Sequence, residues 1–109
     1  MFTICGKTIR MTRGDTLRAI INAETPSGSL YIPEAGDTVR FAMKKDWDSD
    51  TVILTKSVPI DTMMLVLEPE DTEDLDYGRY VFDVQLTYDN GDVDTFIPRG
   101  VLIITQEVL

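Results

Sequence analysis

The chain has 109 residues, 43% of them hydrophobic, with a formal net charge of −9, one cysteine and no histidine. This length suits one core, so we expect residues 1–109 to form a single domain. The missing histidine removes the usual general base and the commonest zinc ligand, and a single cysteine excludes an intramolecular disulfide. We therefore expect neither enzyme activity nor a cofactor.

The charge also narrows the range of partners. Nucleic acids and anionic membranes are bound through clustered Lys and Arg, so we expect neither as a partner. No apolar run approaches the ~20 residues that cross a bilayer. The first ten residues lack the pattern of a secretory signal, and this absence predicts synthesis in the cytoplasm.

The charge is unevenly distributed along the chain. Residues 1–56 carry a net charge of +1 and residues 57–109 a net charge of −10. This asymmetry indicates a solvated acidic face or, alternatively, complementarity with a basic neighbour.

Turn-forming residues recur at roughly 8–12-residue spacing, the pattern of a β-sandwich or barrel. An apolar first segment covers residues 2–11. Three later segments alternate apolar residues with their neighbours, which predicts strands with one buried face. The buried positions are Leu17, Ala19 and Ile21, then Val39, Phe41 and Met43, then Met63, Leu65 and Leu67. Residues 51–57, rich in β-branched side chains, predict a further strand between the last two.

The second half of the chain contains the strongest pattern. Acids that follow a proline predict one or two helical turns over residues 69–75. Residues 79–88 predict a central strand whose large side chains share one face. Asn90 and Gly91 predict a tight hairpin turn that leads into strands at residues 93–97 and 101–105. Together these elements predict an all-β sandwich of two sheets, with about 7–9 short strands and one helical turn.

Four residues carry a resemblance to the immunoglobulin fold. Asp76, Gly78, Tyr80 and Phe82 are similar to the Asp-x-Gly-x-Tyr-x-Cys pattern near the end of variable domains. The resemblance implies an immunoglobulin-like sandwich with a tyrosine corner, in which Tyr80 packs inward and its hydroxyl bonds to backbone a few residues upstream. Phe82 stands where the fold usually has cysteine, so apolar packing replaces the disulfide.

A wider resemblance involves residues 11–18, 36–45, 75–86 and 90–97. Together these segments look like a prophage-encoded structural family that resembles the N-terminal domain of phage tail-baseplate upper proteins. The resemblance implies a module of the virion tail or baseplate that docks onto other tail components, and it implies no catalytic residues. Within residues 1–109 we expect no counterpart of the helical and receptor-binding extension of those baseplate proteins.

Two features of residues 46–50 invite a functional interpretation. Asp46, Asp48 and Asp50 have the alternate spacing of the first ligands in a Ca²⁺-binding loop, but the glycine and the final glutamate of that loop are missing. We therefore favour a solvated acidic loop and predict no metal. Trp47 lies between these acids and is either a core residue or an exposed contact at an interface.

The expected function is structural. A chain without catalytic residues acts by offering a sheet edge or an apolar patch, and residues 2–11 and 101–109 are the candidate edges. Val101 and Ile103 lie in an uncharged β-prone run that should be buried or covered by another subunit. We expect protein partners and self-association into a homo-oligomer. The alternative is an immunoglobulin-like binding module that recognises carbohydrate or a cell-surface protein.

Overall fold

The computed structural model describes residues 2–5, 8–21, 23–24 and 30–106. Over these residues the chain forms ten strands and one helix. The strands are β1 (Phe2–Cys5), β2 (Thr8–Thr12), β3 (Leu17–Ile20), β4 (Ala23–Glu24), β5 (Leu30–Tyr31), β6 (Thr38–Lys44), β7 (Leu54–Val58), β8 (Met64–Leu67), β9 (Gly78–Thr87) and β10 (Val93–Thr105), and the helix is α1 (Pro69–Thr72). The count exceeds the expected seven to nine because β4 and β5 are two-residue strands that pair with each other.

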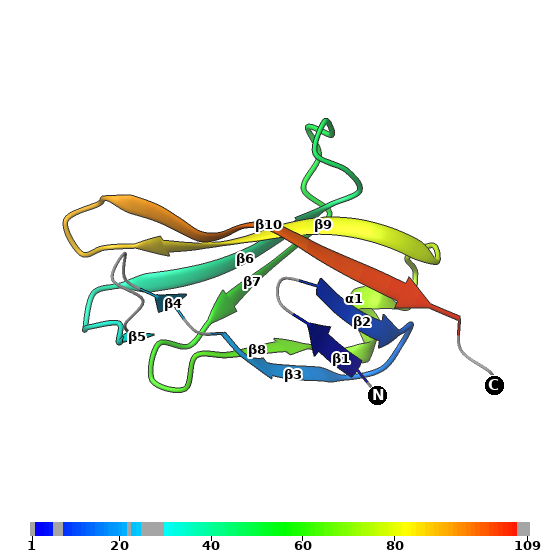
Figure 1. The fold of residues 1–109 in the computed structure, drawn as a ribbon, viewed down its shortest axis with the longest axis horizontal. Helices are drawn as coiled ribbons and strands as arrows, with labels where there is room; N and C mark the ends of the chain where they lie inside the picture. Colours follow the sequence, from blue (N-terminus) through cyan, green and yellow to red (C-terminus); the bar gives the residue numbers. More distant parts are fainter. Residues whose placement is uncertain (1, 6–7, 22, 25–29, 107–109) are drawn as a thin grey trace.

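The strands form a sandwich, as the sequence predicts (Figure 1). The larger sheet has the order β1-β2-β10-β9-β6-β7, and β3 pairs with β8 as a separate two-stranded sheet. All pairings in the larger sheet are antiparallel except that of β2 with β10. Figure 1 shows the larger sheet above and the β3–β8 pair below it. Each sheet thus has one face turned to the core and one turned outward.

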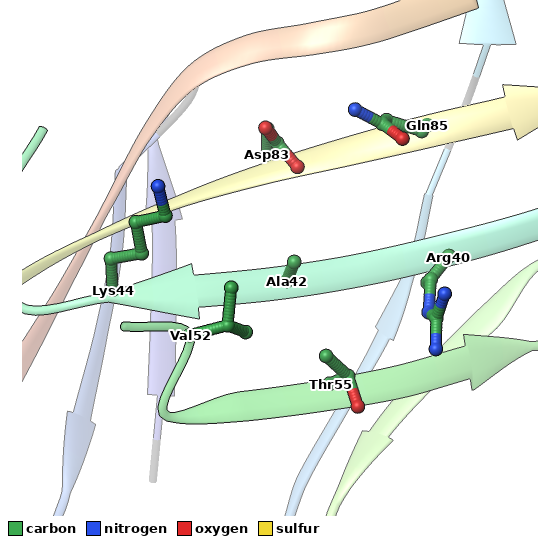
Figure 2. Close-up of a pocket in the computed structure, with 7 residues that line it drawn as sticks. All are labelled: Arg40, Ala42, Lys44, Val52, Thr55, Asp83 and Gln85. Atoms are coloured by element: carbon green, nitrogen blue, oxygen red, sulfur yellow. The ribbon is translucent and has the colours of Figure 1, made fainter. Parts of the chain in front are cut away.

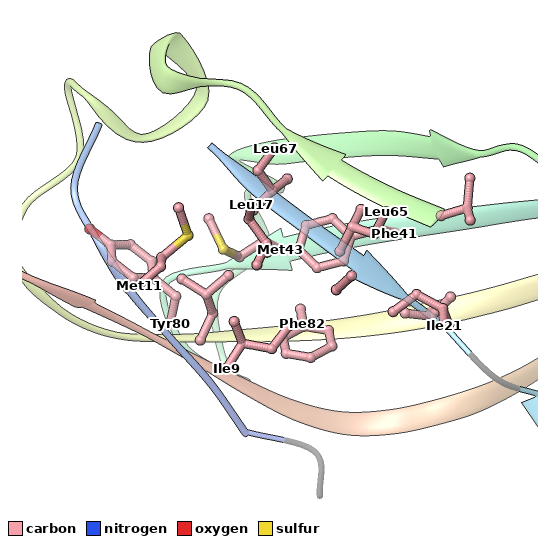
Figure 3. Packing of buried hydrophobic residues seen from close by; sticks show 14 of the residues in the cluster. Ile9, Met11, Leu17, Ile21, Phe41, Met43, Leu65, Leu67, Tyr80 and Phe82 are labelled. Atoms are coloured by element: carbon pink, nitrogen blue, oxygen red, sulfur yellow. The ribbon is translucent and has the colours of Figure 1, made fainter. Parts of the chain in front are cut away.

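The core is filled by the alternating side chains that the sequence singles out (Figure 3). Leu17, Phe41, Met43 and Leu65 are fully buried between the two sheets. Phe41 and Phe82 lie with their ring centroids 5.2 Å apart, so adjacent strands of the larger sheet meet through aromatic contact. Buried apolar area of this kind is the main source of stability in a domain of this size.

The hairpin between β9 and β10 forms at the predicted place but with a longer loop. The Tyr88 amide donates to the Asp92 carbonyl at 2.8 Å, which encloses three residues rather than two. Within this loop Gly91 adopts the left-handed conformation, with a φ of 94°, and Asn90 does not. A three-residue loop that ends in a left-handed glycine is the next most common hairpin after the two-residue type.

The prediction of two strands after this turn is wrong. β10 runs without a break from Val93 to Thr105, and its register against β9 shifts between Thr95 and Ile97 and again between Ile97 and Gly100. Pro98 falls between the register partners Ile97 and Gly100, and such irregular parts of a strand are where proline, which lacks a backbone N–H, is tolerated. The prediction that residues 101–109 form an edge is also wrong where the structure describes them, because β10 lies between β2 and β9, and residues 107–109 lie outside the described residues.

Two other boundaries differ from expectation. The helix covers only Pro69–Thr72. Leu75 already belongs to a turn, in which its amide donates a hydrogen bond to the Thr72 carbonyl. The strand expected over residues 51–57 begins at Leu54. In the part of the chain that the structure describes, no helix is long and apolar enough to span a membrane.

Candidate docking surface

The outward face of the larger sheet is the most distinctive surface of the described chain. On β2, β6, β7, β9 and β10 the residues that alternate with core positions all point to this side, and we call them the outer sheet face. The outer sheet face consists of Thr8, Arg10, Thr12, Thr38, Arg40, Ala42, Lys44, Thr55, Ser57, Arg79, Val81, Asp83, Gln85, Thr87, Val93, Thr95, Val101, Ile103 and Thr105.

The outer sheet face is basic although the chain is acidic. Among its described residues four are basic, namely Arg10, Arg40, Lys44 and Arg79, and only Asp83 is acidic. The formal charge of the whole chain is −9. The strands of the outer sheet face therefore carry a net positive charge, and the adjoining connection between β6 and β7 adds the exposed Asp46, Asp48 and Asp50.

An apolar patch lies between these basic residues. Register places Val101 between Val81 and Thr8, and Ile103 between Arg79 and Arg10. Val101 and Ile103 are half-buried, whereas their neighbours Leu102 and Ile104 point into the core. The run at residues 101–105 is thus divided between core and surface. An apolar centre with a charged rim is the usual composition of a protein interface.

One end of the outer sheet face is hollowed (Figure 2). The hollow has a volume of about 390 Å³ and is lined by Arg40, Ala42, Lys44, Val52, Thr55, Asp83 and Gln85. In Figure 2, Arg40 and Lys44 lie on either side of Ala42 along β6. Burial raises the pKa of the Asp83 carboxyl above its ordinary value, and the Lys44 ammonium opposes that rise.

The connection between β6 and β7 rises from the outward side of the sheet (Figure 1). It carries Trp47, which is 46% exposed, and Val52, which lines the hollow. Of the two interpretations of Trp47, the surface position is the one observed. Of the predicted interface residues, Val101 and Ile103 lie on the outer sheet face, and Trp47 is exposed on the connection between β6 and β7.

The same connection contains the three acids weighed as Ca²⁺ ligands. Asp46, Asp48 and Asp50 are exposed, and the Asp46 side chain accepts a hydrogen bond from the Asp48 amide at 3.1 Å. This bond closes an Asx turn, which is a common structural role for such a residue. Among the described residues no group of three or more possible ligands is arranged to hold a metal ion.

The immunoglobulin-type residues lie at the start of β9. The Tyr80 hydroxyl donates to the Asp76 carbonyl at 2.8 Å, which is the contact expected of a tyrosine corner. Gly78 begins the strand with a φ of 130°. Phe82 is buried against Gly100 on β10, where a Cβ atom would clash with the phenyl ring. Tyr80 and Phe82 are core residues, Asp76 supplies the carbonyl of the corner, and none of the four residues belongs to the outer sheet face.

Another group of acids clusters around α1. Residues 68–76 contain six of them, of which Glu70, Glu73, Asp74 and Asp76 are exposed. Glu68 and Asp71 form a reciprocal capping box, and Asp71 also pairs with Lys56 at 2.7 Å. We call residues 68–77 the acidic turn.

The sequence did not predict the hydrogen bonds that fix the acidic turn to the rest of the chain. The fully buried Thr72 accepts a hydrogen bond from the Gly14 amide at 2.9 Å. Arg13 donates to the Leu75 carbonyl at 3.3 Å and to the Tyr77 hydroxyl at 2.8 Å. These partners are some 60 positions apart in the sequence, so no local pattern could reveal them.

A polar network at the far end of the sheet was also missed. The carboxylate of the buried Asp37 accepts hydrogen bonds from the Tyr31 hydroxyl at 2.8 Å and from the Glu34 amide at 2.9 Å. The Glu34 amide is the main cause of the lowered pKa of Asp37, and the bond to Asp37 is the main cause that raises the pKa of Tyr31 to about 12. Tyr31 also packs edge-to-face on Tyr88.

Comparison with known proteins gives no relative. No protein-family model matches the chain, and no curated protein or solved structure matches it either. The resemblance to phage baseplate proteins gains no support from these comparisons and stays a prediction. The geometry of the described surface is the remaining guide to function.

Proposed function

We propose that this chain is a non-catalytic docking module that binds other proteins through the outer sheet face. The observation that carries the proposal is the half-buried apolar pair Val101 and Ile103, set among four basic residues in a chain of net charge −9. Apolar area supplies affinity, and a surface of one charge steers a partner of the opposite charge.

Charge reversal on the outer sheet face tests this proposal. Arg79→Glu and Lys44→Glu should each weaken capture of a protein partner from the native host lysate, because both reverse the charge beside the apolar patch. Arg18→Glu is the matched control, since Arg18 is exposed on β3 of the other sheet. Loss of capture with all three variants, or with none, would contradict docking through this face.

As the setting we propose a phage or prophage tail or baseplate, with the protein made in the bacterial cytoplasm and built into the virion. Support comes from the resemblance of residues 11–18, 36–45, 75–86 and 90–97. The genes on either side provide the test. Tail tape-measure, baseplate and lysis genes would support this setting, whereas secretion or surface-anchor genes would oppose it.

A second candidate is a module that binds carbohydrate or a cell-surface protein. The exposed Trp47 on the connection that also supplies Val52 to the hollow favours it, because aromatic rings stack on sugars. A glycan array probed with wild type and Trp47→Ala separates the two. Binding that disappears with the substitution would support the carbohydrate function.

A further inference from the structure

The molecule carries two surfaces that complement each other. The outer sheet face offers Arg40 and Lys44 on either side of a hollow with Ala42 and Val52 in its lining. The acidic turn offers four exposed carboxylates and the partly exposed ring of Tyr77, over which the Arg13 guanidinium lies 4.2 Å from the ring centroid. One surface is concave and basic with an apolar lining, and the other is acidic with an aromatic side chain beside it.

We propose that the acidic turn of one copy docks on the outer sheet face of a second copy. The inference rests on the proposed function and names the partner of that face. Carboxylates of Glu73 and Asp74 would lie against Lys44 and Arg40, where opposite charges attract and fix the orientation of the two copies.

The acidic turn is prepared for such a contact. Its capping box, the Gly14–Thr72 hydrogen bond and the bonds from Arg13 hold the backbone in one conformation. Asp71 forms an ion pair with Lys56 of the same chain, so a neighbouring molecule meets the exposed acids of the turn instead. A rigid surface loses little conformational entropy on binding, and that raises affinity.

Asp83 opposes this contact and offers a way to sharpen the test. Its carboxylate lies in the hollow and would repel an incoming Glu73 or Asp74. Asp83→Asn removes that repulsion without changing the size of the side chain. The substitution should therefore tighten self-association, whereas Lys44→Glu should weaken it.

The proposed contact joins two different surfaces, so it is heterologous. Such a contact leaves one surface free on each terminal copy and produces a ring if it closes or a chain if it does not. A homo-oligomer is expected from the sequence, and the two surfaces now specify how it is built. This arrangement also predicts that two defective variants can complement each other.

The experiment is sedimentation velocity on the full chain at ~100 μM and low salt. Wild type should sediment as a species larger than the 12.3 kDa monomer and should dissociate as NaCl rises to ~0.5 M, because salt screens the charges. Arg40→Glu/Lys44→Glu and Glu73→Lys/Asp74→Lys should each be monomeric. Mixed in equal amounts they should associate again, because the intact acidic turn of the first variant meets the intact outer sheet face of the second and the two reversed surfaces also attract each other.

Two charge reversals outside the proposed contact serve as controls. Arg18→Glu and Asp61→Lys reverse exposed charges outside both surfaces and should associate as wild type does. A wild type that is monomeric at low salt, or folded variants whose mixture stays monomeric, would overturn the inference. If a variant fails to fold by circular dichroism, the decision passes to Asp83→Asn: tighter association supports the contact, and unchanged or weaker association refutes it. Partner capture that still depends on Lys44 and Arg79 would leave the proposed function intact.

Discussion

β9 and β10 carry two very different faces on the same backbone. Inward, Tyr80, Phe82 and Leu102 are almost completely buried, whereas outward Arg79, Asp83 and Ile103 meet solvent in part or in full. The period of two in a strand makes this division possible, because neighbouring residues belong to opposite faces. Substitutions on the inward face should therefore change stability, and substitutions on the outward face should change binding.

The largest effect is expected from Phe82→Ala on the inward face. The phenyl ring packs on Phe41 and across Gly100, so its removal loses buried area and leaves a cavity. We expect a loss of about 3–5 kcal/mol in the free energy of unfolding, measured by urea denaturation. A loss below about 1 kcal/mol would place Phe82 outside the core.

Gly100→Ala should act on the same contact from the other strand. Its Cβ would meet the Phe82 ring, so the ring or the backbone must move. Overpacking of this kind costs about 1–3 kcal/mol. Urea denaturation of Gly100→Ala combined with Phe82→Ala provides the check, because the glycine substitution should cost far less once the ring is absent.

Tyr80→Phe keeps the ring and removes only the hydroxyl that donates to Asp76. We expect a loss of about 1 kcal/mol, the usual net value of a hydrogen bond. Thermal and urea unfolding of this variant beside wild type measure it. A wild-type stability would show that the corner bond contributes nothing to folding.

The Asp37 network predicts a pH dependence. Because the pKa of Asp37 is lowered in the folded chain, its stabilisation is present above its unfolded pKa of ~3.9 and is lost as pH falls through the folded value. Asp37→Asn should therefore melt below wild type at pH 6, and the gap should shrink by pH 3. A gap that widens in acid would contradict the assigned contacts.

The smallest effect on stability is expected on the outward face. Lys44→Glu and Arg79→Glu should each change the free energy of unfolding by less than about 0.5 kcal/mol, as surface substitutions do. Urea denaturation provides the measurement. Losses as large as that of Phe82→Ala would break the separation between the two faces.

The sequence predicts the inward face far better than the outward one. Alternation alone identifies Phe41, Met43, Leu65 and Leu67 as core residues, because burial follows a local period of two. The same alternation places Arg40 and Lys44 on one outward face. It cannot bring Arg10 beside Ile103, because that requires the parallel pairing of β2 with β10 from opposite ends of the chain.

The incorrect boundaries have equally physical causes. Pro98 and Gly100 resemble a strand end, yet shifts of register absorb them within β10. The short helix ends at Thr72 because tertiary bonds to Arg13 and Gly14 shape the residues around it. Such contacts join distant positions, so the compact acidic turn could not be anticipated from its own residues.

A concentration series of amide NMR spectra on wild type tests the central claim most directly, since it locates the docking surface residue by residue without any substitution. We predict that raising the concentration at low salt shifts the signals of Lys44, Val81 and Ile103 on the outer sheet face, and of Glu73 in the acidic turn. Arg18 and Ile20 on β3 should stay unchanged. Shifts confined to the β3–β8 pair would contradict docking through the outer sheet face. So would the absence of any shift up to ~1 mM, if the signals of the outer sheet face also stay unchanged when a captured partner is added.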